Sequence, residues 1–289
     1  MKSLWILALA YCFLFAFNVD VHSHLIPNGQ TALLEFSKIE GIVYKDVEVE
    51  KKHFNIIENP LKSNKLYALI PFGYYEKLEN KKIKINYLEN NKNQHEDILL
   101  KVIDGKYKKE AIKVSSSKVN PTKKDVKNRI SREYKEAMHI YYRITEHNYL
   151  MKPFILPLKS KITSPFGKAR IYNGTLKGYH SGTDFRAKIG TPILAANGGK
   201  VVLVKTRFYS GGTVLLDHGN GIYTCYFHMS KFNVKVGEVV QRGEILGLSG
   251  DSGRVTGPHL HFSARINGVQ VDPLQLISLM NENILKGKI

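Results

Sequence analysis

The chain has 289 residues, enough for two domains, and its 43% hydrophobic content suits a packed core. A formal net charge of +18 at pH 7 favours binding to a polyanion such as nucleic acid, anionic lipid or an anionic wall polymer. The sequence has no helix-turn-helix pattern, zinc-finger spacing or RNP-type aromatic motif, so nucleic acid is not the expected partner. The two cysteines, Cys12 and Cys225, belong to no cysteine cluster, so any metal must be bound by histidine and carboxylate side chains.

The first residues are typical of a secretory signal peptide. Met1 and Lys2 give a positive start, and residues 4–17 form an uninterrupted apolar run. This run is shorter than the roughly 20 residues that span a bilayer, although a retained anchor is the alternative. Residues 21–23 offer small or tolerated side chains before a cut. We therefore expect residues 1–23 to be removed and the mature chain to be exported to the periplasm or cell envelope, without stable membrane insertion.

Residues 24–113 are predicted to form a β-sandwich-like N-terminal domain. Short runs rich in Val, Ile, Tyr and Leu alternate with clusters of Asn, Gly, Pro and Lys, as in strands joined by turns. Asp104-Gly105 predicts a hairpin between two such runs. This half contains no catalytic constellation. The expected strands are residues 31–36, 41–49, 65–72, 82–88 and 98–103.

Residues 114–150 are predicted to form a helical linker. Ser115 to Ser117 mark a break, and Thr122 with Asp125 has the spacing of a capping box at a helix start. Basic residues lie mainly off the apolar stripe of this helix, which indicates a solvated face or, alternatively, a polymer-binding patch. The stripe consists of Val126, Ile130, Tyr134, Met138 and Tyr141.

Residues 151–280 are predicted to form a second, strand-rich domain with little helix, followed by a tail at residues 281–289. Asn197-Gly198 predicts a two-residue hairpin, and Gly219-Asn220-Gly221 joins two further runs. The predicted fold class is therefore mainly β: a sandwich, a connecting helix and an antiparallel sheet. The expected strands are residues 192–195, 200–204, 213–217, 222–228, 234–240, 244–249 and 259–266.

Metal-capable side chains are concentrated in this second domain. On a strand, His259 and His261 share one face, while Leu260 and Phe262 point into a core. His180 and Asp184 are four residues apart and share a face in a helix or an extended segment. A catalytic zinc site usually has three protein ligands and one open position. His180, Asp184 and one histidine of the later pair would complete such a set.

His180-x-x-x-Asp184, the later His228 at a strand end and Gly257-Pro-His-Leu-His-Phe262 together resemble the lysostaphin/LytM-type zinc metalloendopeptidases. The resemblance covers residues 150–276 and includes Ser-Pro-Phe-Gly at 164–167, Gly-Thr-Pro-Ile at 190–193 and Asp-His-Gly-Asn-Gly at 217–221. The first half resembles the β-sandwich domain that precedes the peptidase domain in some wall endopeptidases.

This resemblance implies hydrolysis of peptide cross-links in bacterial peptidoglycan. It implies one Zn²⁺ in an open groove, bound by His180, Asp184 and His261, with His228 and His259 as the catalytic pair; the sequence does not separate the roles of these two. It also implies D-alanyl–diaminopimelate bonds rather than glycine bridges as the substrate.

Two other readings differ in what the first half and the metal site do. A non-catalytic wall-binding or amidase-activating module would carry a vestigial metal site, whereas here each expected position is occupied. Alternatively, the N-terminal domain could inhibit the enzyme by covering the groove. Outside the catalytic set, His218 in its turn and Cys225 are predicted to be structural.

Overall fold

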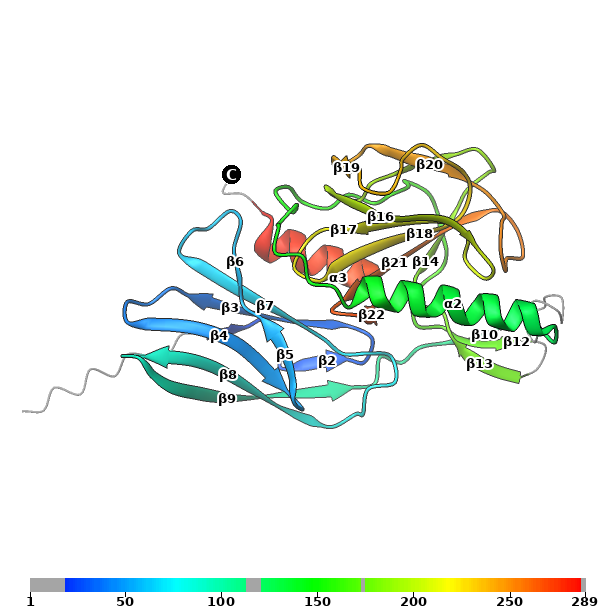
Figure 1. Ribbon diagram of the computed structural model, residues 1–289. Coiled ribbons are helices and arrows are strands. Elements are labelled where there is room, and N and C mark those ends of the chain that lie inside the picture. The colour runs from blue at the N-terminus through cyan, green and yellow to red at the C-terminus, as the bar shows by residue number, and fades with distance from the viewer. Residues whose placement is uncertain (1–18, 113–120, 173–174, 287–289) are drawn as a thin grey trace, which may run out of the picture.

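The computed structural model describes residues 19–112, 121–172 and 175–286 (Figure 1). The apolar run of the expected signal peptide and the break at Ser115 to Ser117 lie outside these residues. Within them the protein is mainly β, with a sandwich, a long helix and a second sheet in chain order, as predicted.

The first half contains two sheets. The four-stranded sheet has the order β1-β3-β7-β6, with β1 at Val19–Val21, β3 at Thr31–Ser37, β6 at Ile57–Glu58 and β7 at Lys65–Pro71. The five-stranded sheet has the order β2-β9-β8-β4-β5, with β2 at Leu25–Pro27, β4 at Ile42–Val49, β5 at Lys52–Asn55, β8 at Asn80–Glu89 and β9 at Lys92–Ile103. Each strand predicted for this half overlaps one of these elements.

The two sheets pack face to face around one hydrophobic cluster. Phe36 of β3 and Ile70 of β7 meet Val47 of β4 and Ile83 of β8 in it, and each is buried. Burial of alternate side chains from both sheets is the packing of a β-sandwich, which confirms that part of the predicted fold class.

In the first half a hairpin forms at one turn sequence but not at the one where it was predicted. The β8–β9 hairpin turns at Asn90 and Asn91, whose φ angles of 50° and 62° suit the two central positions of a type I′ turn. The hairpin predicted at Asp104-Gly105 is wrong. Strand β10 (Lys109–Ile112) pairs in parallel with β12 in the second half rather than with β9. Gly105 N donates to Asn28 Oδ1, so the turn carries the chain out of the sandwich.

Helix α2 (Lys124–Tyr141) connects the halves. The predicted capping box is wrong, because the N-cap is Lys123 and makes no side-chain hydrogen bond. The buried face also differs from the predicted stripe: Tyr134 is 63% exposed, whereas Glu133 is buried. Glu133 accepts hydrogen bonds from Arg129 Nε at 2.7 Å and from Phe208 N at 2.8 Å, and these contacts turn that side of the helix toward the sheet.

A ten-stranded antiparallel sheet dominates the second half, with the path β11-β14-β21-β18-β17-β16-β19. Its strands are β11 Ile162–Ser164, β14 Thr183–Arg186, β15 Pro192–Leu194, β16 Gly199–Arg207, β17 Gly211–Asp217, β18 Ile222–Phe232, β19 Val239–Val240, β20 Ile245–Ser249, β21 His259–Ile266 and β22 Val269–Val271. A smaller sheet joins β10, β12 (Ala169–Tyr172) and β13 (Thr175–Tyr179).

The two turn signals of this half have opposite outcomes. The turn at Gly219-Asn220-Gly221 joins the paired strands β17 and β18, as predicted. The hairpin at Asn197-Gly198 is wrong, because β15 pairs with β20 while β16 pairs with β17 and β19. Asn197 Nδ2 donates to Lys152 O, so this turn is fixed by a distant segment rather than by a neighbouring strand.

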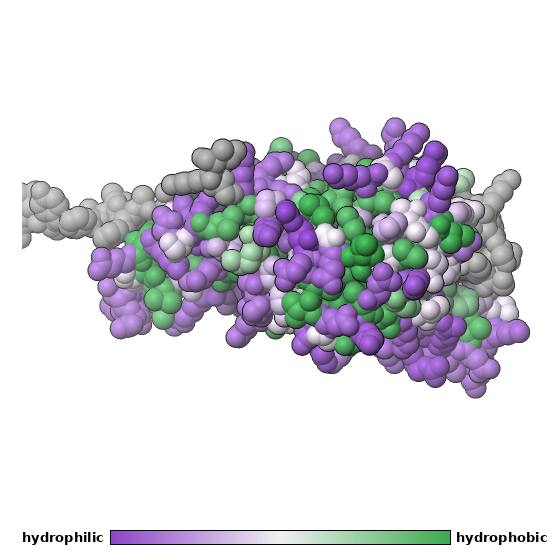
Figure 2. Space-filling view, turned by 90° about the horizontal axis from the view of Figure 1, so that it is seen from above, coloured by the Kyte–Doolittle hydropathy of each residue, from purple (hydrophilic) through white to green (hydrophobic). Residues whose placement is uncertain are grey.

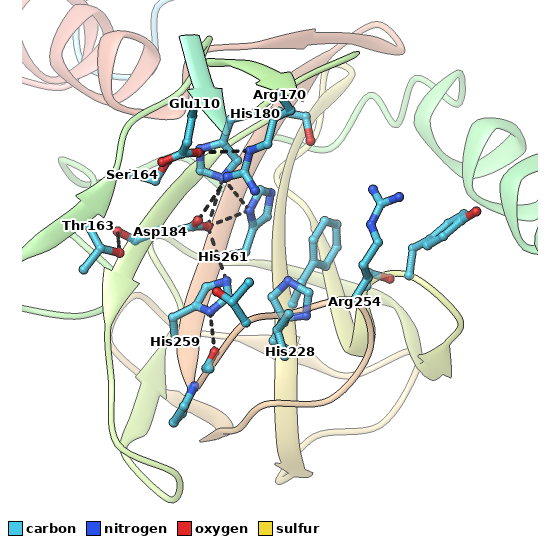
Figure 3. Close-up of a pocket in the computed structure, with 18 of the residues that line it drawn as sticks. Glu110, Thr163, Ser164, Arg170, His180, Asp184, His228, Arg254, His259 and His261 are labelled. Atoms are coloured by element: carbon cyan, nitrogen blue, oxygen red, sulfur yellow. Dashed lines mark hydrogen bonds and ion pairs between the residues drawn. The ribbon is translucent and has the colours of Figure 1, made fainter. Parts of the chain in front are cut away.

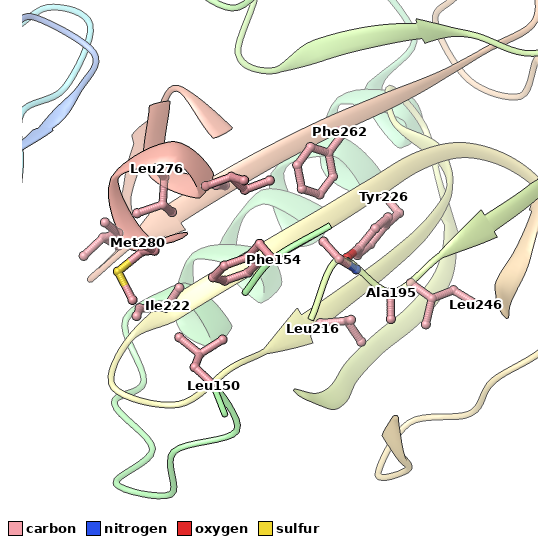
Figure 4. Close-up of a cluster of buried hydrophobic side chains, with 14 of the residues drawn as sticks. Leu150, Phe154, Ala195, Leu216, Ile222, Tyr226, Leu246, Phe262, Leu276 and Met280 are labelled. Atoms are coloured by element: carbon pink, nitrogen blue, oxygen red, sulfur yellow. Dashed lines mark hydrogen bonds between the residues drawn. The ribbon is translucent and has the colours of Figure 1, made fainter. Parts of the chain in front are cut away.

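One hydrophobic core connects the halves, and Figure 4 shows the part of it that lies in the second half. It lies between the sheet, where Tyr226 and Phe262 are fully buried, and the C-terminal helices α3 (Pro273–Leu279) and η1 (Met280–Ile284). Leu33 and Tyr67 of the sandwich belong to the same cluster. Leu285 from the expected tail is buried there too.

The sandwich is also held by polar contacts: Gln275 of α3 exchanges hydrogen bonds with the backbone of Thr31. The first half therefore docks on the α3 side of the sheet.

The surface contains both hydrophobic and hydrophilic residues. On the face shown in Figure 2, hydrophobic residues appear between hydrophilic ones. The exposed large hydrophobic side chains include Val236, Val239 and Ile245 at the β19–β20 end of the sheet. Among the described residues, no helix has the length and apolar character needed to cross a membrane.

Candidate metal and catalytic centre

Three neighbouring strands bring the predicted site residues together. In the pairing of β14 with β21, Asp184 lies opposite His261, and Arg186 lies opposite His259. On the other side of β21, His261 lies opposite Phe227 of β18. Leu260 and Phe262 point into the core, so the predicted alternation along β21 is confirmed.

Donor atoms of His180, Asp184 and His261 converge on one point (Figure 3). His180 Nε2 lies 2.9 Å from Asp184 Oδ1 and 3.0 Å from His261 Nδ1, and His261 Nδ1 lies 2.9 Å from the same carboxylate oxygen. All three residues are buried. Ligand atoms about 2.0–2.1 Å from a tetrahedral zinc ion lie roughly 3.3 Å apart. The donor types and spacing therefore fit a zinc ion.

Outer contacts fix the orientation of these side chains. His180 Nδ1 lies 2.8 Å from Pro165 O, so this nitrogen carries the proton and Nε2 turns its lone pair toward the cluster. Arg170 Nη2 lies 3.3 Å from Asp184 Oδ2, which leaves Oδ1 to the two histidines. Arg170 is also paired with Glu110 of β10. Sequence reasoning missed both residues, because no local pattern indicates that β10 joins β12.

Gly182 allows the close approach of β21. A Cβ at this position would lie 2.4 Å from Phe262 O and 2.6 Å from His261 Nε2. Any side chain would therefore push the His261 ring away from the cluster, which explains why a glycine stands between His180 and Asp184.

His228 reaches the groove through a β-bulge. Gly212 pairs with Met229 but Val214 pairs with Tyr226, so Phe227 and His228 together oppose one residue of β17. His228 has φ of 63°, which is rare for a residue other than glycine. Simple alternation along the strand predicts that His228 shares a face with Tyr226 and Thr224, and the bulge makes that prediction wrong. Those two side chains are buried on the core side, whereas the bulge turns His228 into the groove beside Phe227.

His228 and His259 present equivalent nitrogens to the groove. His228 Nδ1 lies 2.8 Å from Ser252 O, and His259 Nδ1 lies 2.8 Å from Gly257 O. A backbone carbonyl can only accept, so Nδ1 is the donor in each ring and Nε2 keeps its lone pair. The ring centres are 4.8 Å apart, and His259 Nε2 lies 3.6 Å from Asp184 Oδ1.

Burial governs the protonation of this centre. Burial and the neighbouring histidines lower the pKa of His228 to about 3, and burial lowers the pKa of His261 to about 4. Burial alone would raise the pKa of Asp184, but its interactions with the adjacent imidazoles of His180 and His261 outweigh burial and hold that pKa well below its usual value. Near pH 7 the carboxylate is thus ionised while His228 and His261 are neutral, the states that metal binding and proton acceptance require.

The centre lies in a cavity of about 580 Å³, which we call the catalytic groove. Tyr209, Arg254 and Pro258 line one side, and Arg170 and Tyr179 line another. Among the described residues before α2, only Glu110 and Ala111 line it. The sandwich itself thus lies away from the groove.

Two residues predicted to be structural are buried outside the groove. His218 Nδ1 lies 2.6 Å from Gly198 O and its Nε2 lies 2.7 Å from Thr224 Oγ1, so both nitrogens are engaged. Cys225 is a buried free thiol whose Sγ lies 3.4 Å from Tyr141 Oη.

Residues 178–273, which contain the converging donors and both groove histidines, match the model of Peptidase family M23. The chain therefore carries a Peptidase family M23 domain, and the predicted family resemblance is confirmed.

Several particular proteins are similar to it. The chain is 42% identical over 118 residues to the peptidoglycan DD-endopeptidase ShyA of Vibrio cholerae, a match that covers 40% of this chain and 27% of ShyA. It is 38% identical over 120 residues to the DD-carboxypeptidase/endopeptidase Mpg of Neisseria meningitidis, covering 40% of this chain and 27% of Mpg. The chain thus spans about a quarter of the length of these relatives.

A solved structure is similar over most of the chain. It is a peptidase M23 from Pseudomonas aeruginosa, with a TM-score of 0.65 and 27% identity, and the match covers 86% of this chain and 93% of that one. The similarity therefore extends beyond the peptidase domain into the first half.

Proposed function

We propose that this protein is an exported zinc-dependent endopeptidase that hydrolyses peptide cross-links of bacterial peptidoglycan, at D-alanyl–diaminopimelate bonds. The observation that carries the proposal is the convergence of His180 Nε2, Asp184 Oδ1 and His261 Nδ1 within 3.0 Å, beside two histidines with open Nε2 atoms. The names of ShyA and Mpg support the substrate class.

His180, Asp184 and His261 would hold the zinc ion. Two imidazoles and one carboxylate are a ligand set typical of catalytic zinc, which keeps a further position open. When bound, zinc would polarise the substrate carbonyl and lower the pKa of a water molecule. Arg170 would keep Asp184 oriented by holding its second oxygen, and Pro165 O would hold His180 in the required tautomer.

His259 would move the proton. Its open Nε2 lies 3.6 Å from Asp184 Oδ1, beside the donor cluster, so it can accept a proton from the attacking water and return it to the leaving amine. His228 stays neutral because its pKa is lowered to about 3, and its open Nε2 can only accept. It would therefore orient the attacking water or a substrate N–H rather than donate to the developing oxyanion.

Digestion of purified, cross-linked peptidoglycan tests the proposal. The mature chain is incubated with zinc, beside the His180→Ala variant and a chelator-treated sample, and the products are identified by mass spectrometry. We expect dimeric muropeptides to become monomers only with the untreated wild type. Zinc bound at one ion per chain without any cleavage would instead favour the non-catalytic wall-binding or amidase-activating module.

If the protein is exported, removal of the signal peptide must leave a mature N-terminus that keeps the sandwich intact. Strand β1 pairs with β3, and Val19 and Val21 pack against the sandwich core. His22 Nε2 lies 2.6 Å from Glu35 Oε2. A cut after Ser23 would remove this strand, so we propose that cleavage occurs at or before Asn18. The intact mass of the exported protein tests this: a species that begins at His24 would contradict it.

Inhibition by the first half remains a hypothesis. A truncation at residue 150 is a poor test, because it removes β10 and α2 and uncovers the core that Leu33 and Tyr67 share with the second half. Proteolysis of the intact chain between β10 and α2 followed by an activity assay keeps both halves. Increased activity of the nicked protein would support inhibition, and unchanged activity after the two halves have been separated by size would exclude it.

A further inference from the structure

A second cavity continues the catalytic groove beneath helix α2. It has a volume of about 840 Å³ and lies between one face of α2 and the β18–β21–β22 side of the sheet. We call it the α2 pocket. It shares Ser181, Tyr209, Ser210 and Phe227 with the catalytic groove, so the two cavities adjoin along these four residues. Ser181 follows His180 directly, and the ring of Phe227 stacks on His261 at 5.3 Å between centroids.

Two guanidinium groups line the α2 pocket without a carboxylate partner among the described residues. Arg207 Nη2 donates to Glu133 O, while its buried Nε has no hydrogen-bond acceptor. Arg265 donates to Gly268 O and Gln270 Oε1, and its guanidinium lies 4.4 Å from the centre of the Tyr141 ring. Both arginines are therefore held in position by neutral groups, and their positive charges are not neutralised.

The other charged residues that line the pocket leave its lining positively charged. Lys127 adds a third positive charge. Glu133 is the acidic member of the lining, but its carboxylate already accepts from Arg129 Nε and Phe208 N. A guanidinium whose hydrogen-bond partners are all neutral is a strong site for a ligand carboxylate, because a charge-assisted hydrogen bond then also balances the positive charge.

We propose that the α2 pocket binds a carboxylate-bearing segment of the substrate peptide, with Arg207 and Arg265 as the groups that recognise the carboxylate. This inference rests on the proposed function and extends it, because stem peptides carry free carboxylates on their glutamate and diaminopimelate residues. A peptide whose scissile bond lies at the zinc site can pass Ser181 and Phe227 directly into the pocket. The volume of about 840 Å³ accommodates a short peptide segment.

The structure provides a matched pair of variants for the test. Arg207 and Lys205 lie on the same strand, β16, and both contact α2: Arg207 through Glu133 O and Lys205 through the carboxylate of Glu136. Only Arg207 lines the pocket. Arg207→Gln and Lys205→Gln therefore remove the same charge from neighbouring positions. Arg207→Lys keeps the charge and serves as a rescue variant.

Steady-state cleavage of two soluble cross-linked muropeptides distinguishes the outcomes. One substrate has free carboxylates and the other has them amidated. We expect Arg207→Gln to raise KM for the free form about 10-fold or more, with kcat within about threefold, because substrate binding loses a charge-assisted hydrogen bond while the reacting groups are unchanged. Lys205→Gln should match the wild type and Arg207→Lys should recover part of the loss. Amidation should raise the wild-type KM and remove the difference between wild type and Arg207→Gln.

Two results would overturn the inference: an equal KM for the free and amidated substrates in the wild type, or an equal effect of Arg207→Gln and Lys205→Gln. Failure of the proposed function is recognised separately, because the wild type would then cleave neither substrate. In that case calorimetric titration of the intact chain with the free muropeptide decides. Binding that Arg207→Gln weakens at least about 10-fold supports the pocket, and binding unchanged by the substitution rejects it.

Discussion

The two faces of the central sheet use histidine in opposite ways. On the core side, His218 is fully buried and both of its nitrogens meet neutral partners, Gly198 O and Thr224 Oγ1. On the groove side, His180 Nε2 and His261 Nδ1 point at each other and at one carboxylate oxygen. Burial is similar in both places. What separates a structural histidine from a candidate ligand is therefore the direction of its nitrogens, because only the groove side leaves donor atoms converging.

The largest expected effects come from replacing the groove histidines, and they distinguish a zinc ligand from a residue that transfers protons. His261→Ala should abolish both zinc binding and cleavage. His259→Ala should keep one zinc ion per chain while kcat falls about 10²–10⁴-fold, the usual contribution of a general acid–base group. Metal content by mass spectrometry, measured beside turnover, checks both variants. Loss of zinc from His259→Ala would instead make this histidine a ligand, since its Nε2 lies only 3.6 Å from Asp184 Oδ1.

His218 should affect stability and its pH dependence but not the chemistry. Burial lowers the pKa of His218 to about 4, below its ordinary value near 6.5. The unfolded chain therefore binds a proton more readily than the folded chain between these values, so this contribution is complete above pH 6.5 and is lost as the pH falls toward 4. The full span corresponds to roughly 3 kcal/mol.

Urea unfolding at pH 7.5 and pH 5 measures this contribution. His218→Gln removes the titrating group and should reduce the loss of unfolding free energy between the two pH values, while kcat at pH 7.5 stays at the wild-type level. His95→Gln, at an exposed position of β9, is the control and should retain the wild-type pH dependence. An unchanged pH dependence in His218→Gln would show that other buried groups, such as His228, account for it.

Each strand predicted from local patterns overlaps an observed strand, and the alternation of β21 is correct, but short strands such as β10, β12 and β14 were not predicted. His259 and His261 share a face because strand geometry depends on neighbouring residues alone. The same rule failed for His228, because its place in the groove depends on a bulge created by the register of β18 against β17. An alternating pattern contains no signal for an extra residue in the pairing strand.

Turn motifs show the same limit. Gly219-Asn220-Gly221 forms the predicted hairpin because its flanking strands also pair in the sheet. Asn197-Gly198 and Asp104-Gly105 have equally favourable turn residues, but the adjacent strands find other partners, β20 for β15 and β12 for β10. A turn residue specifies a local bend, whereas strand pairing is decided by contacts that are distant in the sequence.

Replacing Arg170 should give the smallest of these effects. It tests whether the orientation of the Asp184 carboxylate depends on a residue that is not itself a zinc ligand. Arg170 holds Asp184 Oδ2, so Arg170→Gln should leave the ligands in place but weaken zinc binding about 10-fold, the lower end of the range for residues that orient ligands. Competition with a chromophoric chelator measures this affinity.

Lys168→Gln is the matched control, because Lys168 also pairs with Glu110, at 2.9 Å, but in the described part of the chain it forms no ion pair with Asp184. An equal loss in both variants would assign the effect to the charge around Glu110. A loss confined to Arg170→Gln would mean that Arg170, on β12, maintains the orientation of the Asp184 carboxylate. This orientation of ligand atoms is what distinguishes the groove face of the sheet from the His218 side.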